Sequence, residues 1–466
     1  MLMNEPASFI KSYLEEVNQS IRELNETAQL TRHQKAWLGF CLTGMLLVNG
    51  INWAKFERVG LGKYKIGGLS WLFRHAQIAW STLLIASVKL ILKQYRITQG
   101  ILVLDESDRA RSKRTKRLYK TYKQKDKITG GYVNGQTIVL LLLVSDSVTL
   151  PVGFAFYMPD PALSAWKRAD ERLKKNGVPK QNRPSEPNRN PNYPTKVELG
   201  LGLLRQFQET HREITVKVIL ADALYGESRF LEQAGSLWDG VQVISQLHKN
   251  QNLWYRGRKR TLENYFNSIN GGVIQTLLVR GQQETPVWIS SARLKVDAHG
   301  NKRFVIAVKY PNEENYRYLV AADLSWRTQD IIQAYTLRWL VEVVFEDWKL
   351  YEGWGREAKQ LDEEGSSRGL ILSLLLDHSL LLHPKQMARL TSKLPAYTVG
   401  SLQQQAQMET LLEFIESLLQ QNQIGEKLKE LGDKIQELFT LRSSKKHMSG
   451  IPLGRLEPTP SLVFKC

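Results

Sequence analysis

The run Ile101-Leu102-Val103-Leu104-Asp105 decides the fold, because it is an apolar segment that ends in a carboxylate. Consecutive apolar residues bounded by polar ones are typical of a strand buried on both faces of a sheet. A second segment has the same form, since Ile214 to Leu220 runs into Ala221-Asp222. Ligands of α/β sheets bind at strand ends, where side chains emerge from the core. Asp105 and Asp222 are therefore candidates for one site, although an aspartate after a strand is more often a turn residue or a helix cap.

The segments around these two strands predict an α/β layer. Strand-like runs, a polar turn and two helical patterns follow one another along the chain. They are the strands Thr137 to Val144, Thr149 to Tyr157 and Val241 to Leu247, the turn Ser145-Asp146-Ser147, and the helices Val197 to Phe207 and 227 to 234. Three strands followed by alternating helices and strands predict a mixed sheet that begins with an antiparallel hairpin.

A long helix is predicted over residues 328 to 350, and it carries Tyr335, Arg338, Glu342 and Lys349 on one stripe. Steps of three, four and seven residues keep these four side chains within an arc of about 60°. The other faces of the helix are apolar, which favours a buried helix over one with a solvated, salt-bridged stripe.

Glu346 projects close to the same arc as Glu342, so spacing alone leaves both open as a partner of Asp105 and Asp222. Three carboxylates that meet at one place form a site for hard divalent ions with oxygen ligands. Two such ions about 3.5–4 Å apart activate an attacking hydroxyl and stabilise the leaving oxygen of a phosphodiester. The arginine and lysine of the helix stripe add positive charge that can hold a phosphate.

The charge balance of the chain points to a polyanionic partner. The 466 residues include 64 Lys plus Arg against 46 Asp plus Glu, which gives a net charge of +18 and a pI near 9.6. Nucleic acid is the first candidate for such a partner, and a merely soluble basic protein is the alternative.

Cysteine usage and hydropathy predict a soluble cytoplasmic protein. Only Cys41 and Cys466 occur, so neither a disulfide framework nor a cysteine-based zinc site is expected. The N-terminus lacks the apolar core of a signal peptide. The most apolar stretches, Ala36 to Val48 and Leu370 to Leu382, are shorter than the roughly 20 residues that a bilayer needs, and no membrane association is expected.

The motif Tyr335-x2-Arg338-x3-Glu342-x6-Lys349 resembles, at every spacing, the YREK signature of the insertion-sequence-four family of bacterial DDE transposases. The sequence Ala221-Asp222-Ala223-Leu224-Tyr225-Gly226, followed by Phe230, resembles the second-aspartate motif of that family. Leu104-Asp105 resembles the end of its first-aspartate strand. The resemblance covers the catalytic core from Asp105 to Lys349, about half of the chain.

This resemblance implies an RNase H-like fold with a β-rich insertion in the 120 residues between Asp222 and Glu342 (342 − 222). It assigns Asp105, Asp222 and Glu342 to catalysis and to the binding of two Mg²⁺ ions, for which Mn²⁺ can substitute. It also identifies Glu342, rather than Glu346, as the third carboxylate.

Relatives of this kind cut a mobile element from its donor DNA through a hairpin on the transposon end and paste it elsewhere. The resemblance places Tyr335, Arg338 and Lys349 on the DNA backbone near the cleaved end. Hairpin formation needs a base moved out of the stack, usually onto an aromatic ring. Trp288 and Trp339 are candidates for that ring, and core packing is the alternative for either.

The first motif departs most from the family, because Asp105 is followed by Glu106-Ser107-Asp108 and Asp108 is a possible substitute. We favour Asp105, which directly follows the apolar run. A basic stretch from Arg109 to Lys127 comes next, with ten cations and one acid. It is expected to contact phosphates nonspecifically, and a solvated mobile loop is the alternative. The expected DNA contacts in it are Lys113, Arg114, Lys116 and Arg117.

These observations predict five parts of the chain. Residues 1–95 form a helical N-terminal domain, expected to bind DNA, in which 53–75 fit either a helix-turn-helix or a plain bundle. The remaining parts are the first part of the catalytic core at 96–250, the β-rich insertion at 251–325, the last part of the core with the Glu342 helix at 326–385, and a helical region for dimerisation or DNA contact at 386–466. Within the core, residues 176–196 contain five prolines and predict an extended or flexible loop.

The sequence thus predicts a cut-and-paste transposase that acts as a homodimer on double-stranded DNA in the bacterial cytoplasm, in association with the nucleoid. Its partners would be the terminal inverted repeats and the target DNA. One alternative is a transposase-derived DNA-binding protein that has lost catalysis. Another is a metal-dependent nuclease without joining activity.

Overall fold

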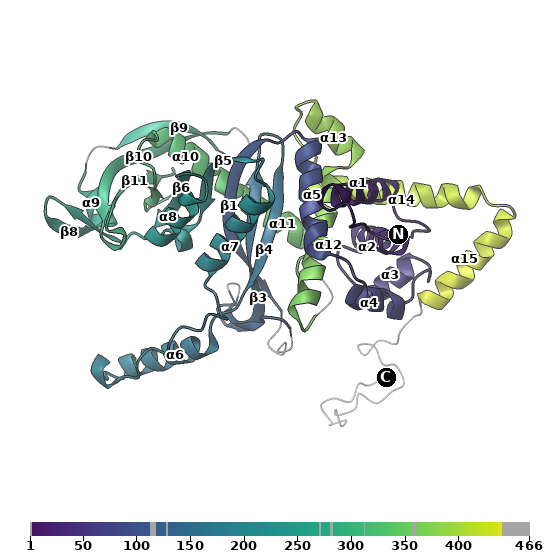
Figure 1. Ribbon diagram of the computed structural model, residues 1–466, viewed down its shortest axis with the longest axis horizontal. Helices are drawn as coiled ribbons and strands as arrows, with labels where there is room; N and C mark the ends of the chain where they lie inside the picture. The colour runs from purple at the N-terminus through teal and green to yellow at the C-terminus, as the bar shows by residue number, and fades with distance from the viewer. Residues whose placement is uncertain are drawn as a thin grey trace, which may run out of the picture.

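The computed structural model describes residues 2–111, 118–126, 129–269, 272–279, 283–311, 313–356 and 360–439. It shows a mixed α/β protein in which one large sheet is flanked by helices from both ends of the chain (Figure 1). The predicted fold class, an RNase H-like mixed sheet with a β-rich insertion and flanking helices, is confirmed.

The core of the sheet has the strand order β4-β3-β1-β5-β6. Its strands are β1 (Gln99–Ala110), β3 (Tyr132–Val144), β4 (Thr149–Tyr157), β5 (Thr215–Ala221) and β6 (Gln242–Leu247). Strand β3 pairs antiparallel with β1 and β4, whereas β1, β5 and β6 run parallel to one another. A short strand β2 (Tyr122–Lys125) pairs with the start of β3. The predicted opening hairpin, helices and strands are therefore present in the predicted order.

The prediction that the first strand ends at Asp105 is wrong. Strand β1 continues to Ala110, because residues 106–110 pair with 135–139 of β3. On its other side the parallel pairing with β5 ends at Leu104 opposite Ala221. Asp105 therefore lies inside a strand, at the point where its parallel neighbour stops and a side chain can reach the gap.

The β-rich insertion continues the same sheet, because β12 pairs antiparallel with β6. The order from β6 outward is β12-β11-β10-β7-β8, and β9 pairs with β10. The bounds are β7 (Asn252–Tyr255), β8 (Arg258–Thr261), β9 (Val273–Val279), β10 (Gln283–Val296), β11 (Lys302–Lys309) and β12 (Arg317–Ala321), with α9 (Leu262–Asn267) after β8.

Helices cover both faces of the sheet. Alternate residues of β1 point to opposite sides, so that Leu102 and Leu104 join one hydrophobic cluster and Val103 joins the other. The first cluster includes α7 (Lys196–Thr210) and α8 (Ser228–Ser236), and the second is built mainly with helices from the two ends of the chain.

The N-terminal region is helical as predicted, with α1 (Ser8–Leu24), α2 (Arg32–Val48), α3 (Trp53–Val59), α4 (Ile66–His75) and α5 (Trp80–Gln94). Residues 76–79 separate α4 from α5. No single helix in the described part of the chain is long and apolar enough to cross a bilayer. Two sharply bent helix pairs, α2 with α3 and α4 with α5, have the required length and hydropathy only when the two helices of each pair are taken together.

The predicted long helix at 328–350 is divided into α10 (Thr328–Thr336) and α11 (Leu340–Leu350). A 3-10 turn, Leu337–Trp339, joins them and keeps helical dihedral angles. After it come α12 (Glu363–Leu381), α13 (Pro384–Thr391), α14 (Val399–Leu419) and α15 (Ile424–Leu438). Helix α6 (Pro161–Lys175) was not predicted; it precedes the proline-rich segment and has no buried residue. The short α9 of the β-rich insertion was not predicted either.

Candidate active site

A cavity of about 540 Å³ lies where β1, the end of β5 and α11 meet. Five of the predicted site residues line it together: Asp105, Asp222, Arg338, Glu342 and Lys349. They come from three segments more than a hundred residues apart in the sequence. The fold therefore brings the residues of all three predicted motifs into one hollow.

The tightest group of acids in this cavity differs from the predicted trio. Ligand oxygens of Asp105, Glu106 and Asp222 lie within 4.8 Å of one another. Glu342 lines the same cavity without belonging to that group in the described residues. Glu106 was overlooked because adjacent strand residues normally point to opposite faces, and only its position directly after Asp105 could have suggested it.

The donor set suits a hard divalent cation, since all three groups offer carboxylate oxygens. One oxygen of Glu106 accepts from the Lys196 ammonium at 2.7 Å. The other, Oε2, is buried and has no hydrogen-bond partner among the residues that the structure describes. An unpartnered, buried carboxylate oxygen beside two further carboxylates is an arrangement that a cation would stabilise.

Asp105 is buried and carries two contacts. Its Oδ2 accepts from Arg338 Nη1 at 2.5 Å, and its Oδ1 accepts from the backbone N–H of Glu106 at 2.8 Å. Burial raises the pKa of Asp105 to about 7, against the opposing effect of the Arg338 guanidinium and with a further increase from Asp222. The ion pair thus holds in place a carboxylate whose charge the interior disfavours.

Asp222 caps a short 3-10 turn, Ala223–Tyr225, directly after β5. Its Oδ1 accepts from the backbone N–H of Leu224 at 2.9 Å. The Tyr335 hydroxyl of α10 donates to the carbonyl of Ala221 at 3.2 Å, and burial raises the pKa of this tyrosine above its usual range. Tyr335 therefore fastens α10 to the end of the strand that presents Asp222.

Glu342 lines the cavity and Glu346 does not, a difference that helical spacing alone could not predict. Both side chains are exposed on α11. Among the described residues, α11 contributes three side chains to the cavity lining: Glu342, Phe345 and Lys349. Glu346 is not one of them. Asp108, the alternative to Asp105, also lines the cavity and accepts from the Thr137 hydroxyl at 2.6 Å, but it lies outside the group of three acids.

The two candidate aromatic residues lie apart from this cavity in the described structure. Trp288 is on β10 and is 47% exposed, and Trp339 is in the 3-10 turn and is 37% exposed. Each side chain is therefore more exposed than a packed core residue would be. The predicted DNA contacts of the basic stretch fall outside the described residues: Lys113, Arg114, Lys116 and Arg117.

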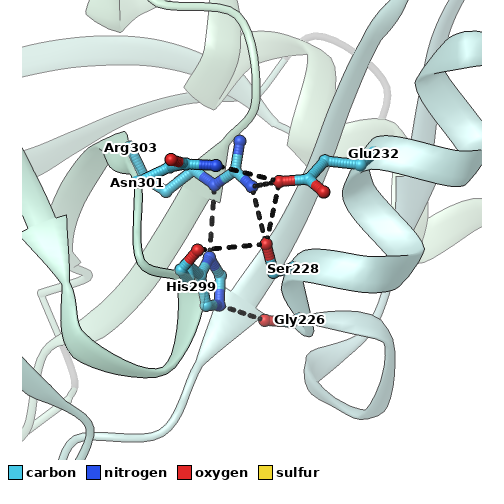
Figure 2. A network of polar contacts seen from close by, with 6 residues as sticks. All are labelled: Gly226, Ser228, Glu232, His299, Asn301 and Arg303. Carbon is cyan, nitrogen blue, oxygen red and sulfur yellow. Dashed lines mark hydrogen bonds and ion pairs between the residues drawn. The ribbon is translucent and has the colours of Figure 1, made fainter.

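A polar network fastens the turn after Asp222 to the insertion (Figure 2). His299 Nε2 is 3.0 Å from the carbonyl of Gly226, and Arg303 Nε donates to His299 Nδ1 at 3.2 Å. Arg303 also donates to Ser228 and Glu232 at the start of α8, at 3.0 and 2.7 Å. Sequence patterns did not reveal this network, because its members come from two segments about 70 residues apart.

Two known protein families match the chain, and the matched ranges include the residues that line the cavity. Residues 27–267 match the DDE superfamily endonuclease family, and residues 190–376 match the transposase DDE domain. Asp105 lies in the first match, Glu342 in the second and Asp222 in both. No curated protein matches the chain. The first match spans 241 residues (267 − 27 + 1), more than half of the 466, and the chain therefore belongs to the DDE superfamily endonucleases.

Proposed function

We propose that this protein is a cut-and-paste transposase, which cleaves DNA at the ends of a mobile element and joins those ends to a target. The observation that carries the proposal is the single cavity in which Asp105, Asp222 and Glu342 face Arg338 and Lys349. Carboxylates for metal ions and cations for phosphate are the two components that phosphodiester chemistry needs. The matches to endonuclease and transposase DDE families agree with this reading.

Asp105, Asp222 and Glu342 are proposed to hold the metal, with Glu106 as a further carboxylate within reach. Mg²⁺ is the proposed ion because every donor is a hard oxygen, and Mn²⁺ should substitute for it. Two such ions, when bound, would activate a water or a DNA hydroxyl and stabilise the leaving oxygen.

The cations of α11 and of the turn before it are proposed to position the DNA. Lys349 lines the cavity two helical turns beyond Glu342, so a phosphate held there lies along the helix from the acids. Arg338 neutralises Asp105 and thereby keeps its side chain directed into the cavity. Tyr335 is proposed to contact the DNA backbone, as the resemblance implies, although its hydroxyl is engaged by Ala221 in this state.

The finer mechanism rests on the YREK spacing of Tyr335, Arg338, Glu342 and Lys349, which favours membership of the insertion-sequence-four family. A hairpin on the transposon end is then proposed as the intermediate. Trp288 and Trp339 are both proposed as rings for the displaced base, since both are partly exposed. The active assembly is proposed to be a homodimer on paired terminal inverted repeats.

The test is to incubate the purified protein with Mg²⁺ and a duplex that carries the terminal inverted repeat of its element. Hairpin-ended fragments on a denaturing gel, followed by their integration into a target plasmid, are the expected products. Chelation of the metal should abolish both products and should leave a DNA-bound species in a mobility-shift assay.

Two other outcomes would replace the proposal. Binding without any cleavage, with Mg²⁺ or Mn²⁺, would indicate a transposase-derived DNA-binding protein. Open-ended cuts that are never joined to target DNA would indicate a nuclease.

A further inference from the structure

Residues 158–195 form an arm that leaves the sheet after β4 and returns at the start of α7. Figure 1 shows α6, the outward half of this arm, projecting away from the sheet and its covering helices. The helix begins firmly, because Asp160 accepts from the backbone N–H groups of Ala162 and Leu163 and Pro161 occupies its first turn. Because α6 buries no residue, packing against the core does not account for its presence.

The returning half of the arm packs along one face of α6 and holds it. Trp166 Nε1 donates to the carbonyl of Pro184 at 2.8 Å. Arg183 Nη1 donates to both carboxylate oxygens of Asp170 at 2.9 Å, in a partly buried pair. The proline-rich segment, predicted to be an extended or flexible loop, therefore braces the helix.

The opposite face of α6 is basic. Five cations lie on it: Lys167, Arg168, Arg172, Lys174 and Lys175. At 100° per residue they fall within an arc of about 160°, which contains a single acid, Glu171. Among the described residues, no carboxylate lies within ion-pair distance of any of the five, and all five are exposed. We call this surface the basic face of the arm.

Both ends of the arm begin beside the candidate active site. Lys196, the first residue of α7, pairs with Glu106 at 2.7 Å. Its ammonium also lies 5.3 Å from the ring centre of Tyr157, the last residue of β4. The basic face therefore extends outward from the acids of the cavity rather than from an unrelated part of the surface.

We propose that the basic face of the arm binds the phosphate backbone of the DNA duplex that leads away from the cleaved position. Fifteen helical residues span about 22 Å, or roughly six base pairs of duplex. This proposal rests on the proposed function, since it assigns the arm to the same DNA that enters the cavity.

The chemistry of the basic face favours DNA over a protein partner. No large apolar side chain is exposed anywhere in residues 158–195, whereas the centre of a protein interface usually needs one. Unpaired lysines and arginines without apolar neighbours are suited to phosphates, and they read charge rather than base sequence. The arm should therefore strengthen binding to any duplex and change the sequence preference little.

The test compares three variants on a long duplex of arbitrary sequence, with fluorescence anisotropy at increasing salt. The triple variant Lys167→Gln, Arg172→Gln, Lys175→Gln should bind more weakly and lower the slope of log affinity against log salt by about two to three. The matched control Arg205→Gln, Arg212→Gln, Lys217→Gln removes the same charge from exposed positions at the end of α7, in the turn that follows and at the start of β5, and it should keep the wild-type slope. The double variant Lys167→Arg, Lys175→Arg should also keep it.

An arm variant with the wild-type slope, or a control that loses as much slope as the arm variant, would overturn the proposal. An arm variant that keeps the wild-type slope but differs from the wild type in oligomeric state by light scattering would also overturn it, because the arm would then contact a second copy of the chain. Equal thermal unfolding of the variants checks that the fold is intact.

The two proposals fail separately in these experiments. If the wild-type protein binds DNA but never cleaves it, the proposed catalysis is wrong and the result on the arm is unaffected. A wild-type protein that cleaves, with an arm variant of unchanged slope, removes the arm proposal alone.

Discussion

Glu342 and Glu346 lie one helical turn apart on α11, and only the first lines the cavity. The Glu342→Gln variant should lose DNA cleavage and keep DNA binding, because the amide is nearly isosteric and is a poorer metal ligand. Loss of an outer-shell partner of a metal site costs about 10–100-fold, so loss of a direct ligand should cost at least about 100-fold in cleavage rate. Single-turnover cleavage of end-labelled DNA measures this.

Glu346→Gln is the matched control for that experiment. It removes the same charge from the same helix and should cleave at close to the wild-type rate. Comparable cleavage by Glu342→Gln, or a loss confined to Glu346→Gln, would show that the third carboxylate has been assigned to the wrong residue.

Glu106 and Asp108 test which acids of β1 belong to the metal site. Glu106 lies within 4.8 Å of Asp105 and Asp222, whereas Asp108 lines the cavity outside that group. Glu106→Gln should weaken Mn²⁺ binding by about 10–100-fold in calorimetry, since it removes one charged donor from the group. Asp108→Asn should change Mn²⁺ affinity little, and a larger loss in Asp108→Asn than in Glu106→Gln would favour Asp108 as the functional acid of this strand.

At the scale of elements, the turn after β5 determines where Asp222 points. Gly226 ends this turn, and a Cβ added there would lie 2.1 Å from the carbonyl oxygen of Gln246 on β6. His299 anchors the carbonyl of the same glycine from the insertion. The insertion is thus part of the support of the second aspartate as well as an extension of the sheet.

Gly226→Ala should destabilise the protein by about 1–3 kcal/mol, because the methyl group meets backbone rather than a movable side chain. It should also lower Mn²⁺ affinity, since the shift of the turn moves Asp222. The control is Gly202→Ala on α7, where nothing lies within 4 Å and the helix should gain about 0.5–1 kcal/mol. Urea unfolding gives both values, and equal stability of the two variants would contradict this account of the turn.

The sequence predicted the core strands and helices because each has a local signature in apolar spacing. It could not show that β1 continues past Asp105, since those residues are held by cross-strand pairing with β3 rather than by apolar content. For the same reason it missed Glu106, and the roles of Asp105, Asp222 and Glu342 remain predictions. The arm helix α6 was missed because it buries no apolar stripe, which is the signal that helix prediction uses.

At the scale of the whole molecule, the N-terminal helices are joined to the sheet by a buried polar chain. The hydroxyls of Tyr13 and Ser87 lie 2.7 Å apart, and Ser87 Oγ is 2.7 Å from His378 Nδ1. His378 Nε2 is in turn 3.0 Å from the carbonyl of Pro151 on β4. Helices α1, α5 and α12 and the sheet therefore share one interior.

The same interior holds a pair of carboxyl groups, of which Glu352 is buried and Asp377 is half-buried. Burial raises the pKa of Asp377 to about 7 and that of Glu352 well above its usual value, and the neighbouring Asp377 carboxylate raises the pKa of Glu352 further. Because these folded-state pKa values lie above the unfolded values of about 4, the stabilisation is complete below pH ~4 and is lost as the pH rises through the folded pKa values.

Asp377→Asn should therefore gain stability relative to the wild type as the pH rises from about 5 to about 8, because it cannot acquire the buried charge. Thermal unfolding of both proteins across this range measures the difference. The control Asp146→Asn, in the exposed turn between β3 and β4, should follow the wild-type profile. Parallel profiles for Asp377→Asn and the wild type would show that the carboxyl pair does not ionise in this range.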